Sequence, residues 1–431
     1  MLEVKPFSQR DRRFREMMAR GCDRNLEDEL LAEDAILRVR EDGGPGLLHC
    51  ISEFESPAIA MNTLRVSEAE LAAARNAVSE QFLTALCLAR VNARKFHEYQ
   101  RRRGYVCDDN DQVILSRQVR PLRRVGILCG ESFSALLMHA APAMLAGVGQ
   151  IAIAAKPGPD GLIDPHILAA AKVMGIEEVY RMSGAHAVAA FAFGAGPVAR
   201  VDKVVGPGGP LAAAAKRLVN GCVGVDTRQG VSELAVVADA SANAKFIAGD
   251  FLAQAEQDSV GMLALFSTDR IVAEAVRIEM DRLADLLPDA GRIRENLSKR
   301  CAIWVCSSLD VAIRAVNELA PARLALQTLD NDEYLSDVET AGAVFVGPWS
   351  AETAGGCFSG VNPYLPDGGQ ARFCSGLGVE DFVREMTVVE YGPDRLMRTG
   401  RHLAILAEEE NFTARAEAVR ERLELLKLTA D

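Results

Sequence analysis

The histidines of the sequence are too far apart to form a local metal site. They are His49, His97, His139, His166, His186 and His402, and no two of them lie within ten residues of each other. A zinc site on one helix or loop needs ligands a few residues apart, as in His-Glu-x-x-His. The sequence therefore excludes a local histidine-based site, and only ligands from distant segments could hold a metal.

A polar face on one expected helix could also carry chemistry. Asp250, Gln254 and Gln257 recur at helical spacing within residues 242–257, which places them on one side of a helix. Because this helix lies between two expected strands, the side chains either point into a cleft or form a solvated stripe. Ser232-Glu233, at the start of the preceding strand, has no base at a suitable spacing, so no hydrolase triad is predicted.

Two turns between an expected strand and an expected helix are further candidates. The turn Gly206-Pro207-Gly208-Gly209 could present backbone N–H groups to a phosphate, although a tight turn needs glycines in any case. At the other turn, the helix dipole would lower the pKa of the Cys129 thiol. A buried, inert thiol is the competing interpretation of Cys129.

Alternating apolar runs and helical patterns position these residues. Successive βα units of this size predict an α/β fold with parallel sheets covered by helices. The expected strands are Val125–Cys129, Gln150–Ala155, Glu178–Met182, Lys203–Val205, Leu234–Ala238, Ala264–Ser267, Ala302–Val305 and Ala343–Val346. The expected helices between them are Phe133–Ala146, Ile163–Met174, Ala185–Phe193, Pro210–Asn220 and Ala242–Gln257.

The flanking regions are expected to be mainly helical. A helical pattern covers Ala74–Arg103, and a long helix at Arg401–Leu428 is interrupted near Asn411. The apolar window Ala135–Ala155 contains His139 and Pro142, so a buried helix and strand are predicted there, not a membrane span.

Composition indicates a soluble, globular, cytoplasmic protein. Of 431 residues, 49% are hydrophobic and 25% charged. The net charge of −12 argues against nucleic-acid binding, because no basic stripe is present to neutralise phosphates. The ten cysteines are scattered without a Cys-x-x-Cys pair, which favours reduced thiols in a cytosol. Residues 1–20 show no signal-peptide pattern.

Motifs in order along residues 25 to 425 resemble those of histidinol dehydrogenases. They are Arg120–Gly126, Ser183–Ala187, Val201–Gly208, Ser232-Glu233, Phe251–Glu256, Ala341–Gly347, Ser359–Asn362 and Met386–Val388.

The resemblance implies two incomplete Rossmann-like parallel-sheet domains with swapped helical terminal segments, in a homodimer. We therefore expect an N-terminal helical segment at 1–24 and a first α/β domain at 25–123 and 232–377. A second Rossmann-like α/β domain is expected at 124–231 and a C-terminal helical segment at 378–431. The resemblance also implies a zinc-anchored amino-alcohol site and two successive NAD-dependent oxidations.

Three of the four zinc-ligand positions that the resemblance implies carry different residues here. The family's glutamine is kept as Gln254, but its two histidines correspond to Gln257 and Arg415, and its aspartate to Gly356. One amide oxygen cannot hold zinc, and an arginine repels a cation, so zinc is not expected. Cys357 lies beside the changed aspartate position, and the roles of Cys129 and Cys357 stay open.

The implied catalytic and cofactor positions are changed as well. The family's Glu-His base pair falls on Ala322 and Arg323, and neither side chain accepts a proton. The positions that contact NAD fall on Leu128, His186 and Gly209, so the resemblance alone does not establish NAD binding. The substrate-contacting positions Ser232, Gln254 and Glu410 match the family.

These substitutions lead to the prediction that the chain has lost zinc-dependent histidinol oxidation. Because guanidinium groups suit anions, a small anionic molecule is expected at a rebuilt site, unless the arginines pair with Glu410 or another acid. That site comprises Ser232, Gln254, Gln257, Arg323, Glu410 and Arg415. Two alternatives are a metal-independent NAD(P)-dependent dehydrogenase of another alcohol, with His186 as its only base candidate, and a non-catalytic dimeric scaffold.

Overall fold

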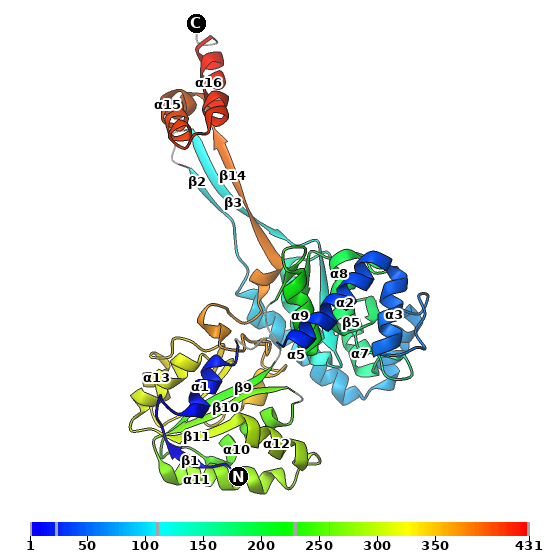
Figure 1. Cartoon of the computed structure of the whole chain (residues 1–431), viewed down its shortest axis with the longest axis vertical. Coiled ribbons are helices and arrows are strands. Elements are labelled where there is room, and N and C mark those ends of the chain that lie inside the picture. The colour runs from blue at the N-terminus through cyan, green and yellow to red at the C-terminus, as the bar shows by residue number, and fades with distance from the viewer. Residues whose placement is uncertain (1, 22–24, 109–111, 227–230, 258, 429–431) are drawn as a thin grey trace. The chain divides into compact units, whose positions relative to one another are not determined.

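Figure 1 shows the chain as a computed structural model, which describes residues 2–21, 25–108, 112–226, 231–257 and 259–428. The chain divides into two compact units, Met1–Gln100 with Leu122–Phe382, and Arg101–Pro121 with Val383–Asp431. The domain boundaries predicted from the sequence stay a prediction, because this division into units does not test them. The predicted boundary residue 24 lies outside the described residues. Among the described helices, none has the length and apolar character needed to cross a membrane.

The first unit contains a six-stranded parallel sheet in the order β1-β11-β10-β9-β12-β13. Its central strand β9 is flanked by β10 and β12 and is buried along its whole length. The strands are β1 (Val4–Pro6), β9 (Ser232–Ala238), β10 (Val260–Ser267), β11 (Cys301–Val305), β12 (Arg323–Gln327) and β13 (Ala343–Val346). The N-terminal segment predicted as helical thus also supplies an edge strand, β1.

A five-stranded parallel sheet in the order β6-β5-β4-β7-β8 forms the other half of the first unit. Its strands are β4 (Arg124–Gly130), β5 (Gln150–Ala155), β6 (Glu178–Arg181), β7 (Lys203–Val205) and β8 (Gly224–Val225). The two parallel sheets confirm the predicted α/β, Rossmann-like fold.

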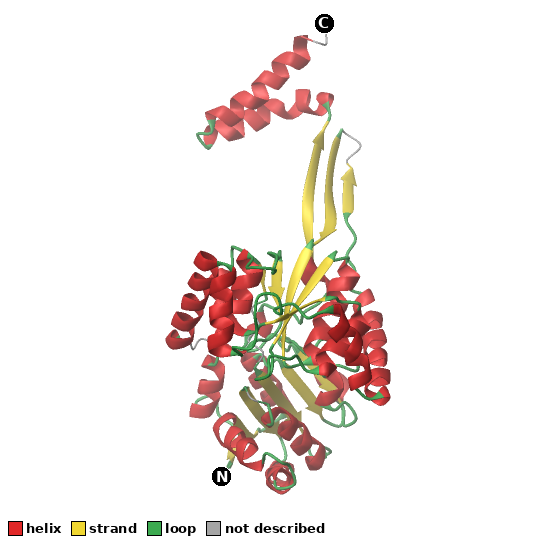
Figure 2. Cartoon of the chain, turned by 90° about the vertical axis from the view of Figure 1, so that its right-hand side faces the viewer, coloured by secondary structure: helices red, strands yellow, loops and turns green. Residues whose placement is uncertain are grey.

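The alternation of side chains along the strands explains why helices cover both faces of the five-stranded sheet. On β5, Ala152 and Ala154 face the core shared with α8 and α9, whereas Ile153 and Ala155 face the core shared with α6 and α7. Figure 2 shows helices on both sides of the strands of the first unit.

The five helices predicted between the strands are present within two residues of their predicted bounds, whereas the helices between residues 270 and 335 were not predicted. The apolar window at 135–155 forms a buried helix and a strand, as predicted. The helices are α1 (Arg12–Ala19), α2 (Leu26–Asp42), α3 (Gly44–Phe54), α4 (Glu68–Ala74), α5 (Glu80–Glu98), α6 (Phe133–Ala146), α7 (Pro165–Met174), α8 (Gly184–Phe193), α9 (Gly209–Val219), α10 (Ala244–Ala255), α11 (Arg270–Ala284), α12 (Ala290–Arg300), α13 (Leu309–Leu319) and α14 (Asn331–Leu335). Short 3₁₀ helices lie at Arg75–Ala77, Glu352–Gly355, Gln370–Arg372 and Val379–Phe382.

The single helix predicted at Ala74–Arg103 is interrupted. The hydroxyl of Ser79 accepts the N–H of Phe82 at 3.1 Å and begins a new helix, α5, after the 3₁₀ turn. A serine at this position satisfies an N–H group that the first helical turn leaves free.

The second unit is an antiparallel sheet with a helical hairpin. Its strands are β2 (Tyr105–Asp108), β3 (Val113–Pro121) and β14 (Val383–Tyr391), in the order β14-β3-β2. The helices are α15 (Pro393–Glu409) and α16 (Thr413–Leu428). They pack so closely at Gly400 that a Cβ there would lie 2.9 Å from the Leu423 side chain. The break near Asn411 is as predicted, but the C-terminal segment predicted as helical also contains β14.

One buried carboxylate joins four distant segments of the first unit. Glu233 pairs with Arg20 at 2.7 Å and accepts the backbone N–H groups of Ala322 at 3.1 Å and Gly368 at 2.9 Å. With every oxygen engaged by donors, the buried charge is compensated. Within the Ser232-Glu233 motif, Glu233 therefore has a structural role, and Ser232 remains as a candidate for the active site.

Candidate active site

Ser232 and Gln254 meet at the amino end of β9. Ser232 is the first residue of the strand, and its hydroxyl donates to the side-chain oxygen of Gln254 on α10. Both residues are buried. The structure thus brings together two residues that the sequence suggested as substrate contacts.

Arg323 and Glu352 extend this cluster. Arg323 begins β12, beside β9, and its Nε lies 2.7 Å from Oε1 of Glu352 while another guanidinium nitrogen donates to the Pro363 carbonyl at 2.8 Å. Burial raises the pKa of Glu352, and the charge of Arg323 together with the bonds from Gln254 and Arg323 only partly offsets this.

A second carboxylate, Asp250, lies beside Glu352. It is one helical turn before Gln254 on α10 and accepts the backbone N–H of Glu352 at 3.3 Å. Burial raises the pKa of Asp250 to about 6, and the charge of Glu352 adds to the rise. A carboxylate with this pKa is ionised at neutral pH and can take up a proton.

Gln257 does not join the cluster, contrary to the predicted polar face. The helix α10 ends at Ala255, two residues before its predicted end, so Gln257 lies beyond the helix. Its side chain is exposed and donates back to the Ala253 carbonyl at 3.4 Å.

The predicted residues of the C-terminal helices belong to the second unit. Glu410 follows the last residue of α15, and the Arg415 guanidinium on α16 lies 4.1 Å from the centre of the Phe412 ring. Their part in a site with Ser232 and Gln254 stays a prediction.

Two of the predicted cofactor positions lie together at the carboxyl ends of β4 and β7. At Gly206, φ is +105° and a Cβ would come within 2.1 Å of the Leu128 carbonyl oxygen, so only glycine fits. Gly209, with φ of +71°, begins α9. The turn therefore packs directly against strand β4, and a glycine turn at the start of a helix is the kind of turn that can bind a dinucleotide phosphate.

A buried ion pair holds this glycine turn in place. Lys216 pairs with Asp226 and donates to the Gly206 carbonyl at 2.9 Å, while the Gly206 N–H donates to Asp226 at 2.9 Å. Burial would raise the pKa of Asp226, but the charge of Lys216 and these hydrogen bonds hold it below its usual value. The turn is therefore fixed before any ligand binds.

The third predicted cofactor position, His186, is in the first turn of α8 and is buried. Its Nε2 lies 3.4 Å from Oε1 of Glu55, the residue that follows α3. Sequence reasoning missed Glu55, as it missed Glu352, because each partner is far away in the chain and carries no motif.

The cysteines that the sequence left open are poor nucleophiles. Burial raises the pKa of Cys129 to about 12, which overrides the expected effect of the helix dipole. Burial also raises the pKa of Cys357. Both side chains are therefore protonated thiols at neutral pH.

The residues at the implied zinc positions do not fit a zinc ion. Across the described ranges, no group of three or more His, Cys, Asp or Glu side chains could hold a metal. The Gln254 oxygen already accepts the Ser232 hydroxyl, and Gly356 has no ligating side chain. Tetrahedral zinc sites need three or four nitrogen, sulfur or carboxylate ligands.

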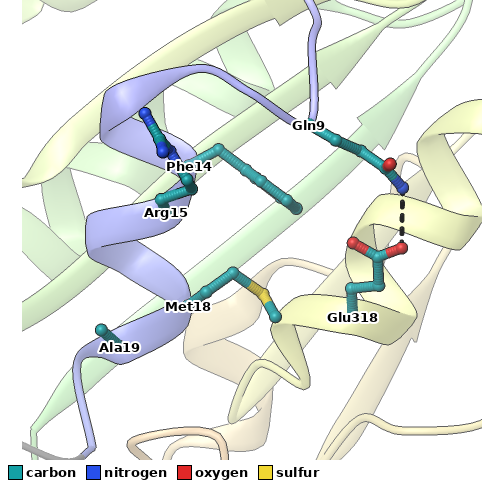
Figure 3. Close-up of a pocket in the computed structure, with 6 residues that line it drawn as sticks. All are labelled: Gln9, Phe14, Arg15, Met18, Ala19 and Glu318. Carbon is teal, nitrogen blue, oxygen red and sulfur yellow. Dashed lines mark hydrogen bonds between the residues drawn. The ribbon is translucent and has the colours of Figure 1, made fainter.

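A hollow of about 470 Å³ between α1 and α13 lies outside this cluster (Figure 3). A hydrogen bond of 2.8 Å between Gln9 and Glu318 crosses it. The hollow contains none of the residues predicted from the sequence to carry chemistry, and we place the candidate active site at Ser232 and Gln254. Its lining residues are Gln9, Phe14, Arg15, Met18, Ala19 and Glu318.

Comparison with known proteins gives matches along the whole chain. The histidinol dehydrogenase family model matches residues 24–423. A protein of Chlorobaculum tepidum named histidinol dehydrogenase is 38% identical over 99% of this chain and 100% of its own length. One from Geobacter sulfurreducens with the same name is 38% identical over 96% of this chain and 97% of its own. The crystal structure of histidinol dehydrogenase from Elizabethkingia anophelis superposes with a TM-score of 0.90 at 29% identity, covering 99% and 98% of the two chains.

These matches correct the prediction of a protein that has lost histidinol oxidation, and with it the two alternative functions. Full-length relatives named histidinol dehydrogenase point to the ordinary enzyme, and nothing in the comparisons indicates a pseudoenzyme. The expectation of an anionic ligand assumed that the arginines give the site a surplus of positive charge, and this assumption is wrong. Arg323 is paired with Glu352, and Asp250 is adjacent, so the cluster has no surplus positive charge.

Proposed function

The chain belongs to the histidinol dehydrogenase family, and we propose that it oxidises histidinol or a closely related amino alcohol with NAD as the oxidant. The observation that carries the proposal is the full-length similarity, 38% identity over 99% of the chain. Both parallel sheets of the fold are present, and in this proposal the five-stranded sheet binds the dinucleotide and the six-stranded sheet the amino alcohol.

In the proposed reaction, Ser232 and Gln254 bind the polar groups of the amino alcohol at the amino end of β9. When NAD is bound at the turn Gly206–Gly209, it supplies the hydride acceptor for the alcohol carbon. Asp250 takes up the hydroxyl proton, because its pKa of about 6 leaves it ionised at neutral pH. Loss of one hydride and one proton converts the alcohol to an aldehyde, and a second round with water gives the acid.

Glu352 and Arg323 have a positioning role in this proposal. The ion pair of 2.7 Å fixes Glu352 beside Asp250, while the Ser232 hydroxyl holds the Gln254 amide oxygen. The family also implies zinc, but the residues at those positions do not fit it. The proposal therefore contains no step that depends on a metal.

We further propose that the chain forms a homodimer through its second unit. Strands β2, β3 and β14 are largely exposed, and a sheet is stable when a partner covers its apolar side chains. Exposed apolar residues of this unit are Tyr105, Val106, Leu115, Val389, Leu406 and Leu425. Light scattering of the purified protein should give twice the chain mass, and a monomer would contradict the proposal.

The experiment that tests the oxidation follows NADH formation from histidinol by absorbance. Asp250→Asn should lower kcat by roughly 100-fold, the usual size of a lost general base. The exposed Asp281→Asn on α11 is the matched control and should keep wild-type activity. Wild-type protein that forms no NADH, with or without added zinc, would refute the proposed function.

Activity measured after dialysis against a chelator tests the metal separately. Retained activity would show that the proposed proton transfer and substrate contacts, which use Asp250, Ser232 and Gln254, are sufficient without a bound metal. Activity that disappears and returns with zinc would show that ligands outside the described cluster hold a metal.

A further inference from the structure

Glu55 is a buried carboxylate whose hydrogen-bonding capacity is only half used. Its Oε1 accepts the Ser183 hydroxyl and lies 3.4 Å from Nε2 of His186. The Glu55 and His186 side chains are only 2% and 4% exposed. Among the described residues, Oε2 of Glu55 and Nε2 of His186 have no hydrogen-bond partner.

This arrangement leaves the start of α8 without its usual cap. Ser183 occupies the N-cap position, yet its side chain makes no bond to the helix because it donates to Glu55 instead. Ser132 and Ser308, at the starts of α6 and α13, accept backbone N–H groups in the ordinary way. The position of Glu55 therefore diverts a residue that would otherwise cap the helix.

The cluster lies at the edge of the five-stranded sheet where a dinucleotide would bind. Gly130, Ala155 and Arg181 are level with one another at the carboxyl ends of β4, β5 and β6. The helices α8 and α9 leave this edge side by side, and α9 begins at the Gly206–Gly209 turn. In open parallel sheets, ligands bind at this edge, where the strand order reverses.

An aromatic ring lies beside the His186 side of the cluster. Phe54 is half-exposed, and its ring stacks on His186 with an interplanar angle of 15° and centroids 6.4 Å apart. Displacement of this one exposed ring would open the pair to a ligand with its own flat ring, such as a nucleotide base.

The chemistry of the free oxygen decides which ligand fits. A buried carboxylate oxygen only accepts hydrogen bonds, and leaving it unsatisfied is costly. The hydroxyl groups of a ribose are donors and would satisfy it. A 2′-phosphate brings further negative charge and only acceptors at neutral pH, so Glu55 would repel it.

We propose that Glu55 determines the choice of cofactor, accepting the ribose hydroxyls of NAD and excluding the 2′-phosphate of NADP. Ser183 and His186 hold the carboxylate in position, and Phe54 moves aside when the nucleotide binds. The inference rests on the proposed function, because it assigns a residue of the dinucleotide site that this function requires.

The test uses calorimetric titration of the full chain with ADP-ribose and with its 2′-phosphate, neither of which takes part in oxidation. Wild-type protein should bind ADP-ribose more tightly by roughly 10- to 100-fold, the range of a charged hydrogen bond. Glu55→Gln should lose most of this preference, and Glu53→Gln, an exposed substitution on the same helix, should keep it. Equal binding of the two ligands by the wild type would overturn the inference without any variant.

Kinetics distinguish a failure of this inference from a failure of the proposed function. If histidinol is oxidised and Glu55→Gln keeps the wild-type ratio of kcat/KM for NAD over NADP, Glu55 does not select the cofactor. If histidinol is not oxidised while the ADP-ribose preference still depends on Glu55, the substrate is wrong and the role of Glu55 is supported. A thermal melt of each variant verifies that it is folded.

Discussion

Two of the buried charged clusters in the first unit differ in how completely their atoms are paired. At the amino ends of β9 and β12, Glu352 is paired with Arg323, whose guanidinium also donates to the Pro363 carbonyl, and the Gln254 oxygen accepts the Ser232 hydroxyl. At the start of α8, Glu55 and His186 each keep a buried atom without a hydrogen-bond partner among the described residues. A fully paired cluster fixes the geometry of a site, whereas a half-paired one retains binding capacity for a ligand.

Removing one partner of the paired cluster should have the largest effect on stability. Glu352→Ala leaves the Arg323 guanidinium, only 13% exposed, without its carboxylate, and we expect a loss of about 3–5 kcal/mol in the free energy of unfolding. Urea denaturation measures this value. The exposed Lys299–Glu295 pair provides the control, since Glu295→Ala should leave the unfolding midpoint unchanged. If both substitutions lowered the free energy of unfolding equally, burial of the Arg323–Glu352 pair would not explain its contribution to stability.

Asp250 sharpens the comparison through its pH dependence. Its pKa rises from 3.8 in the unfolded chain to about 6 in the folded protein, so the folded state favours the protonated form. The stabilisation of the folded state by protonated Asp250 is therefore fully present below pH 3.8, and it is lost as the pH rises through 6. Asp250→Asn, which mimics the neutral form, should therefore be more stable than the wild type by about 2 kcal/mol near pH 8.

Denaturation curves at several pH values verify this prediction. The stability difference between Asp250→Asn and the wild type should shrink toward zero near pH 4, below most of the titration. A difference that stays constant from acid to alkaline pH would show that Asp250 is not held in an environment that disfavours its charge. The same variant is expected to lose activity, so stability and catalysis should change in opposite directions.

A substitution in the Glu55–His186 cluster should have the smallest effect on the free energy of unfolding. Ser183→Ala removes the one hydroxyl that donates to Glu55, and we expect a loss of about 1–2 kcal/mol in unfolding free energy. Thermal melts with and without saturating ADP-ribose separate two contributions. The ligand should stabilise the wild type more than the variant, because Glu55 is no longer held in place. Identical ligand-induced shifts would place Ser183 outside the binding site.

Much of the fold could be predicted because its signals are local. Gly130, Gly147 and Gly175 follow the ends of strands or helices with positive φ, and such positions mark element ends in a sequence. The strand β12 was missed because its run Arg323–Gln327 is short and lies directly after a proline and an alanine. Only its pairing with β9 and β13 defines it.

The site was harder to predict, because its partners come from distant segments. Ser232 and Gln254 were found, yet Glu352 begins a short 3₁₀ helix and Glu55 follows the end of α3, and neither position carries a recognisable motif. Gln257 was placed wrongly since a helix end moved by two residues turns a side chain away. The charge at Arg323 was misjudged for the same reason: its sequence position does not reveal the carboxylate 2.7 Å away.

The bonds of Glu233 have a consequence for synthesis of the chain on the ribosome. This carboxylate needs donors from Arg20, Ala322 and Gly368, so its charge cannot be fully compensated until more than four-fifths of the chain has emerged. Strand β9, which contains Glu233, sits at the centre of its sheet and also waits for β12. The strands of the five-stranded sheet are all synthesised by residue 225, so their pairing can begin earlier, while the six-stranded sheet is completed late in translation.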